Sequence, residues 1–214
     1  MKYKGVIFDL DGVIVSTDNC HYLAWKEMAD KESIFFDRKI NERLRGVSRN
    51  ESLNIILEKS KKNYTLQEKN KLTEYKNNIY KNLIQKLTPN DILPGVSKLL
   101  KYLKKNNIKI AIGSSSKNTK IILNQIGLDD FFDAIVDGND IKKSKPDPEV
   151  FILAGKQLNV ISNKAIVVED SIAGVESGLA AGMDVLAVGY ASSYKKATYR
   201  LNNLDDDKVF EMLN

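Results

Sequence analysis

Two aspartates interrupt an apolar run near the start of the chain. In VIFDLDGVI (residues 6–14), Asp9 and Asp11 are two residues apart, so an extended backbone points both side chains to the same side. Glu169 and Asp170, in VVEDS, form a second acidic pair after another apolar run. Carboxylates brought this close would repel one another, and would be protonated or paired with a hard cation. Mg²⁺ suits such a set, because it binds carboxylate oxygens together with substrate phosphate and water.

Two further motifs offer groups that bind phosphate oxygens. Ser114, in SSSKN, supplies a hydroxyl next to backbone N–H groups, and Lys145, in KSKPDP, supplies a fixed positive charge. Purely structural functions are also open, because Ser114 could cap a strand end and Asp170 could cap the helix that begins near SIAG. Each motif alone is weak, and the prediction of a phosphate site depends on all of them meeting.

The elements around these motifs place them at one edge of a sheet. Val/Ile/Ala-rich strands are expected at residues 3–9, 108–114, 134–136, 165–169 and 184–188. Helices are expected at 96–105, 118–126, 148–158 and 172–181. This alternation predicts an α/β fold, a Rossmann-like parallel sheet with helices on both faces. The motifs follow successive strands, and ligands of such sheets bind outside the carboxyl ends of the strands.

The pattern of apolar residues over residues 15–90 predicts a helical insertion after the first strand. Thr65 and Glu68 form a capping box before a helix with apolar residues at three- and four-residue intervals, and Pro89, Pro94 and Gly95 mark its end. We therefore expect a core domain of residues 1–14 and 91–214 and an α-helical cap domain of residues 15–90. An outer strand and helix are expected to finish the chain within LNNLDDDKVFEML, residues 201–213.

Composition excludes several classes of protein. The net charge is +5, and residues 15–90 hold this surplus, with 15 Lys and Arg against 10 Asp and Glu. These basic residues are scattered, which fits either solvated helices or a surface that attracts a small anion, and argues against nucleic acid. No apolar run is long enough to span a membrane, no signal peptide is recognisable, and Cys20 is the single cysteine. We expect a cytoplasmic protein with no membrane partner, and a monomer.

Together, FDLDGV, SSS, KPDP and VEDS resemble the haloacid dehalogenase superfamily of phosphotransferases over essentially the whole chain. The resemblance implies that Asp9 is the nucleophile that becomes an aspartyl phosphate, and that Asp11 is the general acid/base. It implies Mg²⁺ held by Asp9, the backbone carbonyl of Asp11, and the pair Glu169 and Asp170. The transferring phosphate would be bound by three residues of the core: Ser114, Ser115 and Lys145.

The helical insertion resembles the β-phosphoglucomutase branch of this superfamily, through HYLAWK, RLRGVSRNESL and Lys76. This implies a second phosphate site, with Arg49 binding the phosphate that is not reacting. The substrate and this phosphate would be bound by residues of both parts of the chain: His21, Trp25, Arg45, Gly46, Arg49, Ser52, Lys76, Ser116, Lys117 and Asn118. Ser16 and Arg45 depart from the pattern, which favours an acidic residue and a lysine there, and leave sugar specificity open.

The expected function is therefore the interconversion of β-D-glucose 1-phosphate and glucose 6-phosphate, with a sugar phosphate as the small-molecule partner. Glucose 1,6-bisphosphate would be the priming intermediate. The alternative is a Mg²⁺-dependent sugar- or polyol-phosphate phosphatase on the same framework, which needs one phosphate site and a route for water. A binding module without catalysis is disfavoured, because Asp9, Asp11, Lys145 and Asp170 are all present.

Overall fold

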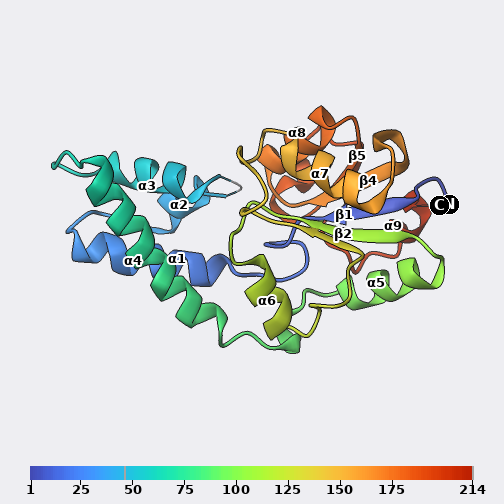
Figure 1. Ribbon diagram of the computed structural model, residues 1–214, viewed down its shortest axis with the longest axis horizontal. Helices are drawn as coiled ribbons and strands as arrows, with labels where there is room; N and C mark the ends of the chain where they lie inside the picture. The colour runs from blue at the N-terminus through green and yellow to red at the C-terminus, as the bar shows by residue number, and fades with distance from the viewer. Residues whose placement is uncertain (46, 214) are drawn as a thin grey trace.

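The computed structural model of the chain describes residues 1–45 and 47–213. Within these ranges a sheet of six parallel strands has the order β3-β2-β1-β4-β5-β6 (Figure 1). Its strands are β1 (Gly5–Phe8), β2 (Lys109–Gly113), β3 (Ala134–Val136), β4 (Ala165–Glu169), β5 (Asp184–Ala187) and β6 (Tyr199–Arg200). The predicted parallel α/β fold is confirmed.

The strands read as continuous apolar runs because helices cover both faces of the sheet. Val6 and Phe8 of β1 join one hydrophobic cluster, whereas Ile7 between them points into another. In the first cluster, three helices pack against one face of the sheet: α5 (Val96–Lys105), α6 (Thr119–Gln125) and α9 (Lys208–Leu213). Helices α7 (Glu149–Leu158) and α8 (Ile172–Ala180) cover the other (Figure 1).

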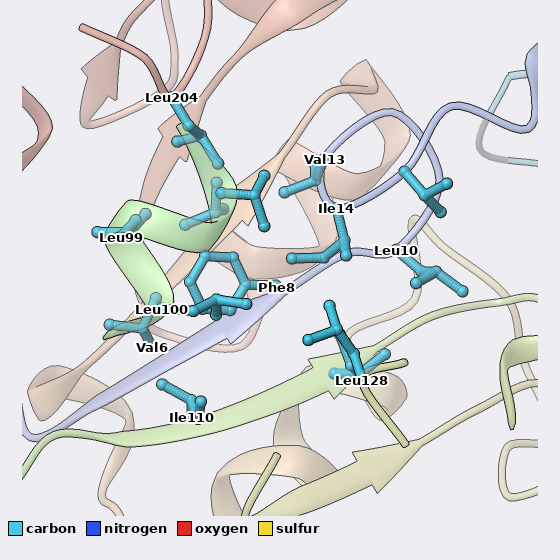
Figure 2. Packing of buried hydrophobic residues seen from close by; sticks show 14 of the residues in the cluster. Val6, Phe8, Leu10, Val13, Ile14, Leu99, Leu100, Ile110, Leu128 and Leu204 are labelled. Atoms are coloured by element: carbon cyan, nitrogen blue, oxygen red, sulfur yellow. The ribbon is translucent and has the colours of Figure 1, made fainter. Parts of the chain in front are cut away.

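The first cluster also fixes the turn that follows β1. Figure 2 shows Ile14 of this turn beside Phe8, near the leucines of α5, and Leu10 and Val13 of the turn belong to the same cluster. Leu10, Ile14 and Phe8 are fully buried. Each fully buried side chain of this size contributes about 2 kcal/mol of burial free energy. The backbone that carries Asp9 and Asp11 is therefore held between buried residues on either side.

Four helices are inserted between β1 and β2 and lie to one side of the sheet (Figure 1): α1 (Asp18–Lys31), α2 (Arg38–Glu42), α3 (Arg49–Leu57) and α4 (Leu66–Ile84). They share a third hydrophobic cluster that includes Trp25, Met28 and Ile56. The Thr65–Glu68 capping box at the start of α4 is present. A helical group with its own core fits the predicted cap, while the boundaries at residues 15 and 90 stay a prediction.

Short elements complete the chain: the 3₁₀ turns η1 (Pro89–Asp91), η2 (Ser162–Lys164) and η3 (Gly189–Ser193). Strand β6 and helix α9 form an outer finish: α9 lies within the predicted segment 201–213, whereas β6 precedes Leu201 and lies outside it. Among the described residues, no helix is long and apolar enough to cross a membrane.

Candidate active site

The carboxyl ends of the strands open into a cavity of about 790 Å³ between the sheet and the inserted helices. Asp9 follows β1 and donates its backbone N–H to the carbonyl of Val168 in β4, at 2.9 Å. Ser114 follows β2, and Glu169 and Asp170 end and follow β4. The register that pairs Phe8 with both Ile112 and Val168 aligns these strand ends. The convergence expected from the sequence is therefore present.

Lys145 is the cation at the centre of the acidic groups. Its Nζ donates to Asp9 Oδ1 at 2.5 Å and lies 3.5 Å from Glu169 Oε2. Burial disfavours the ammonium ion, but the Asp9 and Glu169 carboxylates outweigh it and raise the pKa of Lys145. The lysine therefore stays charged beside Asp9, where a phosphoryl group attached to that residue would need neutralising charge.

Asp9, Glu169 and Asp170 form the acidic cluster of the site, with one oxygen from each within 4.8 Å of the others. Burial, opposed by Lys145 and reinforced by Asp9, raises the pKa of Glu169 to about 7. Burial and the Glu169 charge raise the pKa of Asp170 to about 8. Three acids in one buried place are costly to ionise without a cation.

The donor set fits a hard divalent cation. Glu169 Oε2 is buried and accepts no hydrogen bond from any described residue, so one carboxylate oxygen is left for a ligand. Two glycines make room for this cluster. A Cβ on Gly12 (φ +83°) would lie 2.1 Å from Asp170 Oδ2, and one on Gly174 would lie 2.0 Å from the Glu169 carboxyl carbon. Side chains at either position would displace the carboxylates.

The N-cap of α8 is Ser171, not Asp170. Ser171 Oγ accepts from the N–H of Gly174 at 3.1 Å and donates to Glu169 Oε1 at 2.8 Å. The structural reading of Asp170 as the cap is therefore wrong, and its carboxylate is left to face the cavity. Ser114 does act as a strand-end cap, since its Oγ accepts from the N–H of Ser116 at 3.1 Å.

Asp11 has the pKa of a group that can exchange a proton near neutrality. Burial and the Asp9 carboxylate raise its pKa to about 7, against the hydrogen bond that Thr17 donates to it. Tyr80 of α4 in turn donates to Thr17 Oγ1 at 3.2 Å. Thr17 and Tyr80 were not predicted as site residues. No local pattern distinguishes them, because the contact between them joins residues 63 positions apart.

His21, Trp25 and Lys76 line the helical wall of the cavity. Lys76 is 2 % exposed, its Nζ lies 2.9 Å from His21 Nδ1, and its ammonium lies 4.9 Å from the Trp25 ring centre. Burial, reinforced by Arg49, lowers the pKa of Lys76 well below its ordinary value. Burial and the charge of Lys76 do the same for His21. This wall therefore offers hydrogen-bonding groups, and burial disfavours the charged forms of His21 and Lys76.

Arg49 is the free cation of the helical wall. It begins α3 after the N-cap Ser48, as the sequence indicates, and lines the cavity half-buried. Burial lowers its pKa, and it forms no hydrogen bond or ion pair within the described part of the chain. An unpaired, half-buried guanidinium favours an anionic ligand.

Residues of the β2 loop line the same cavity. Asn118 donates to Asn77 Oδ1 of α4 at 3.0 Å, Ser115 Oγ is buried and has no hydrogen-bond partner among the residues that the structure describes, and Lys117 is exposed. Of the site residues predicted from the sequence, Gly46 lies outside the described residues. All the others line the cavity: Asp9, Asp11, His21, Trp25, Arg45, Arg49, Ser52, Lys76, Ser114, Ser115, Ser116, Lys117, Asn118, Lys145, Glu169 and Asp170. Their individual functions stay predictions.

Similarity to known proteins agrees with this geometry. The sequence profile of the haloacid dehalogenase-like hydrolase family matches residues 6–188. The chain is 47 % identical over 188 residues to β-phosphoglucomutase of Bacillus subtilis, covering 87 % of this chain and 83 % of that protein. It is 31 % identical over 184 residues to a phosphorylated carbohydrates phosphatase of Thermotoga maritima, covering 85 % and 82 %.

Solved structures give the same relationship. The crystal structure of β-phosphoglucomutase from Clostridium difficile superposes with a TM-score of 0.92 and 42 % identity, over 98 % of this chain and 95 % of that one. The profile, the identity and the superposition together cover both the sheet and the inserted helices. The chain belongs to the haloacid dehalogenase-like hydrolase family, in its β-phosphoglucomutase branch.

Proposed function

We propose that this chain is a β-phosphoglucomutase, which interconverts β-D-glucose 1-phosphate and glucose 6-phosphate through an aspartyl-phosphate enzyme. The observation that carries the proposal is one cavity with anion-binding groups on two sides. Lys145 and Ser114 lie at the sheet edge around Asp9, and unpaired Arg49 lies on the helical wall. A substrate that carries phosphate at both ends needs two such sites.

In the proposed reaction Asp9 Oδ attacks the phosphorus of glucose 1,6-bisphosphate, and the bond from phosphorus to the sugar oxygen breaks. Asp11, with its pKa of about 7, gives a proton to the departing oxygen. In the reverse step Asp11 accepts the proton from the sugar hydroxyl that attacks the aspartyl phosphate. Because the sugar can present either end to Asp9, the same two residues serve both half-reactions.

The site would hold Mg²⁺ through Asp9, Glu169, Asp170 and the backbone carbonyl of Asp11. When bound, the cation would neutralise phosphoryl charge as a carboxylate approaches it. Lys145 adds a fixed positive charge at Asp9, and Ser114 adds a hydroxyl. Positioning and charge neutralisation then supply most of the rate enhancement.

The inserted helices, residues 15–90, would act as a cap over this site. The cap supplies Arg49 for the distal phosphate, assisted from the core by Ser116, Lys117 and Asn118. The buried pair of His21 and Lys76 supplies hydrogen-bonding partners for sugar hydroxyls. Closure would keep water from the aspartyl phosphate, which a mutase requires and a phosphatase does not.

A sugar-phosphate phosphatase is the second candidate, favoured by the 31 % identity to the Thermotoga maritima phosphatase. The two are separated by supplying β-D-glucose 1-phosphate with a trace of glucose 1,6-bisphosphate and Mg²⁺, then measuring glucose 6-phosphate and inorganic phosphate. A mutase gives glucose 6-phosphate with little free phosphate. Free phosphate as the main product would contradict the mutase proposal and support the phosphatase.

A further inference from the structure

Arg45 lies between α2 and α3 and reaches across the cavity to the sheet. Its Nη2 donates to Asp18 Oδ2 at 2.8 Å, and its Nη1 lies 3.9 Å from Asp170 Oδ2. Its guanidinium carbon lies 5.6 Å from the ring centre of Tyr190. One side chain therefore contacts a residue of the inserted helices and two residues beyond β4 in the sheet region.

The groups on the sheet side are held firmly. Tyr190 is the second residue of η3, after Gly189, whose φ is +53° and whose N–H donates to the Asn202 carbonyl at 3.0 Å. The next residue, Ala191, donates its N–H to the carbonyl of Asp170 at 2.8 Å. A backbone hydrogen bond therefore joins the turn that carries Tyr190 to Asp170. The Tyr190 side chain is 55 % exposed, so packing of the core does not explain its position.

We propose that Arg45 is a latch that holds the cap closed over Asp9, by joining Asp18 on the cap to Asp170 and Tyr190 on the core. It is a positioning residue, and the proposal rests on the proposed function in taking the helical group to be a mobile cap and, for one of its readouts, Asp9 to form a phosphoenzyme. The planar guanidinium is what this position needs, because one nitrogen faces each carboxylate while its face lies against a ring. A lysine would keep the charge and lose this geometry.

The latch also bears on cation binding. The guanidinium places positive charge 3.9 Å from Asp170, one of the acidic groups suited to Mg²⁺. Removing that charge should tighten Mg²⁺ binding to the ligand-free protein, and a lysine should leave it nearly unchanged. The charge of Arg45 is therefore tested by Mg²⁺ binding, and the geometry of its guanidinium is tested by cap closure.

The test uses the full chain with Arg45→Lys, Arg45→Met and Tyr190→Ala. Arg43→Met is the matched control, because Arg43 lies two residues away and pairs with exposed Glu58 at 2.8 Å, away from the cavity. Amide hydrogen exchange of residues 44–45, 47–52 and 189–193 reports on cap opening. The lifetime of the phosphoenzyme formed with acetyl phosphate reports on water entry. Calorimetric titration with Mg²⁺ alone reports on the charge.

All three latch variants should speed exchange in these segments and shorten the phosphoenzyme lifetime by about two- to fivefold. Arg45→Met alone should tighten Mg²⁺ binding by about two- to fivefold, and Arg43→Met should match the unmodified chain. Wild-type exchange and lifetime in Arg45→Lys and Tyr190→Ala would overturn the latch, as would equal changes in Arg43→Met. None of these readouts uses a glucose phosphate, so failure of the latch and failure of the mutase assay are distinguishable.

Discussion

The two walls of the cavity differ in whether their cations are paired within the protein. At the sheet edge, Lys145 contacts Asp9 at 2.5 Å and lies 3.5 Å from Glu169, so its charge is matched within the protein. On the helical wall, Arg49 has no partner among the described residues, and burial lowers the pKa of Lys76. The cation beside Asp9 is therefore already paired within the protein, while Arg49 is left for an anionic ligand.

This contrast separates chemistry from recognition. Changes at the sheet edge should reduce every reaction that passes through Asp9, whatever the phosphate donor. Changes on the helical wall should affect only substrates that present a second phosphate or a sugar to that wall.

The largest effect is expected from Asp9→Asn. The amide keeps the size of the side chain but is a poor nucleophile, so mutase turnover and aryl phosphate hydrolysis should both fall by at least about 10⁴-fold. Circular dichroism and thermal unfolding should show an intact fold. Retained turnover in a folded variant would contradict the assignment of Asp9 as nucleophile.

Lys145→Ala should be the next most damaging change. It removes the only cation that contacts Asp9 within the described chain, and should lower kcat for both mutase flux and aryl phosphate hydrolysis by about 10²- to 10³-fold. Lys143→Ala is the control, because Lys143 is exposed and pairs with Asp147 instead. Similar losses in both variants would point to a general effect of surface charge.

Arg49→Ala should distinguish the two walls. Loss of a charged contact to the distal phosphate should reduce mutase flux by roughly 10- to 100-fold. Hydrolysis of a simple aryl phosphate, which has no second phosphate, should stay within about twofold of the unmodified chain. Equal damage to both reactions would count against a second phosphate site at Arg49.

Magnesium binding should depend on pH. The pKa values of about 7 for Glu169 and about 8 for Asp170 mean that these acids hold protons below neutrality and release them when a cation binds. Mg²⁺ affinity in calorimetric titrations should therefore rise between pH 6 and pH 8. For each proton that Mg²⁺ displaces, the affinity should rise by up to about tenfold per pH unit. Affinity that does not change over this range would show that the carboxylates are already ionised in the ligand-free protein.

The smallest effect is expected from Thr17→Val. The hydrogen bond from Thr17 lowers the pKa of Asp11, so its loss should move that pKa upward from about 7. The limb of the kcat/KM profile that reports on Asp11 should move to higher pH by less than about one unit. A shift to lower pH would contradict the assignment of that limb to Asp11.

The sequence predicted the sheet edge better than the helical wall. Asp9, Ser114 and Asp170 each follow an apolar strand, and parallel strands bring such positions together by topology alone. On the helical wall, Arg49 and Lys76 look like ordinary surface residues of basic helices, and only the resemblance singled them out.

What the sequence could not show are contacts made by tertiary packing. Tyr80 reaches Thr17, and Asp18 reaches Arg45, only when the inserted helices pack against one another, and the turn after β1 brings Thr17 to Asp11. Ser171 displaced Asp170 as the cap of α8 because both residue types suit that position and one residue of register decides between them. The departure of Arg45 from the expected lysine is explained by contacts to Asp170 and Tyr190 that no local pattern records.

The most direct test is a crystal structure of the chain with Mg²⁺, glucose 6-phosphate and a fluoride mimic of the planar phosphoryl group. We expect the planar group in line with an Asp9 carboxylate oxygen and beside Lys145, with the sugar phosphate bound to Arg49. A planar group away from Asp9, or a sugar phosphate that leaves Arg49 without a ligand, would contradict the two-walled site.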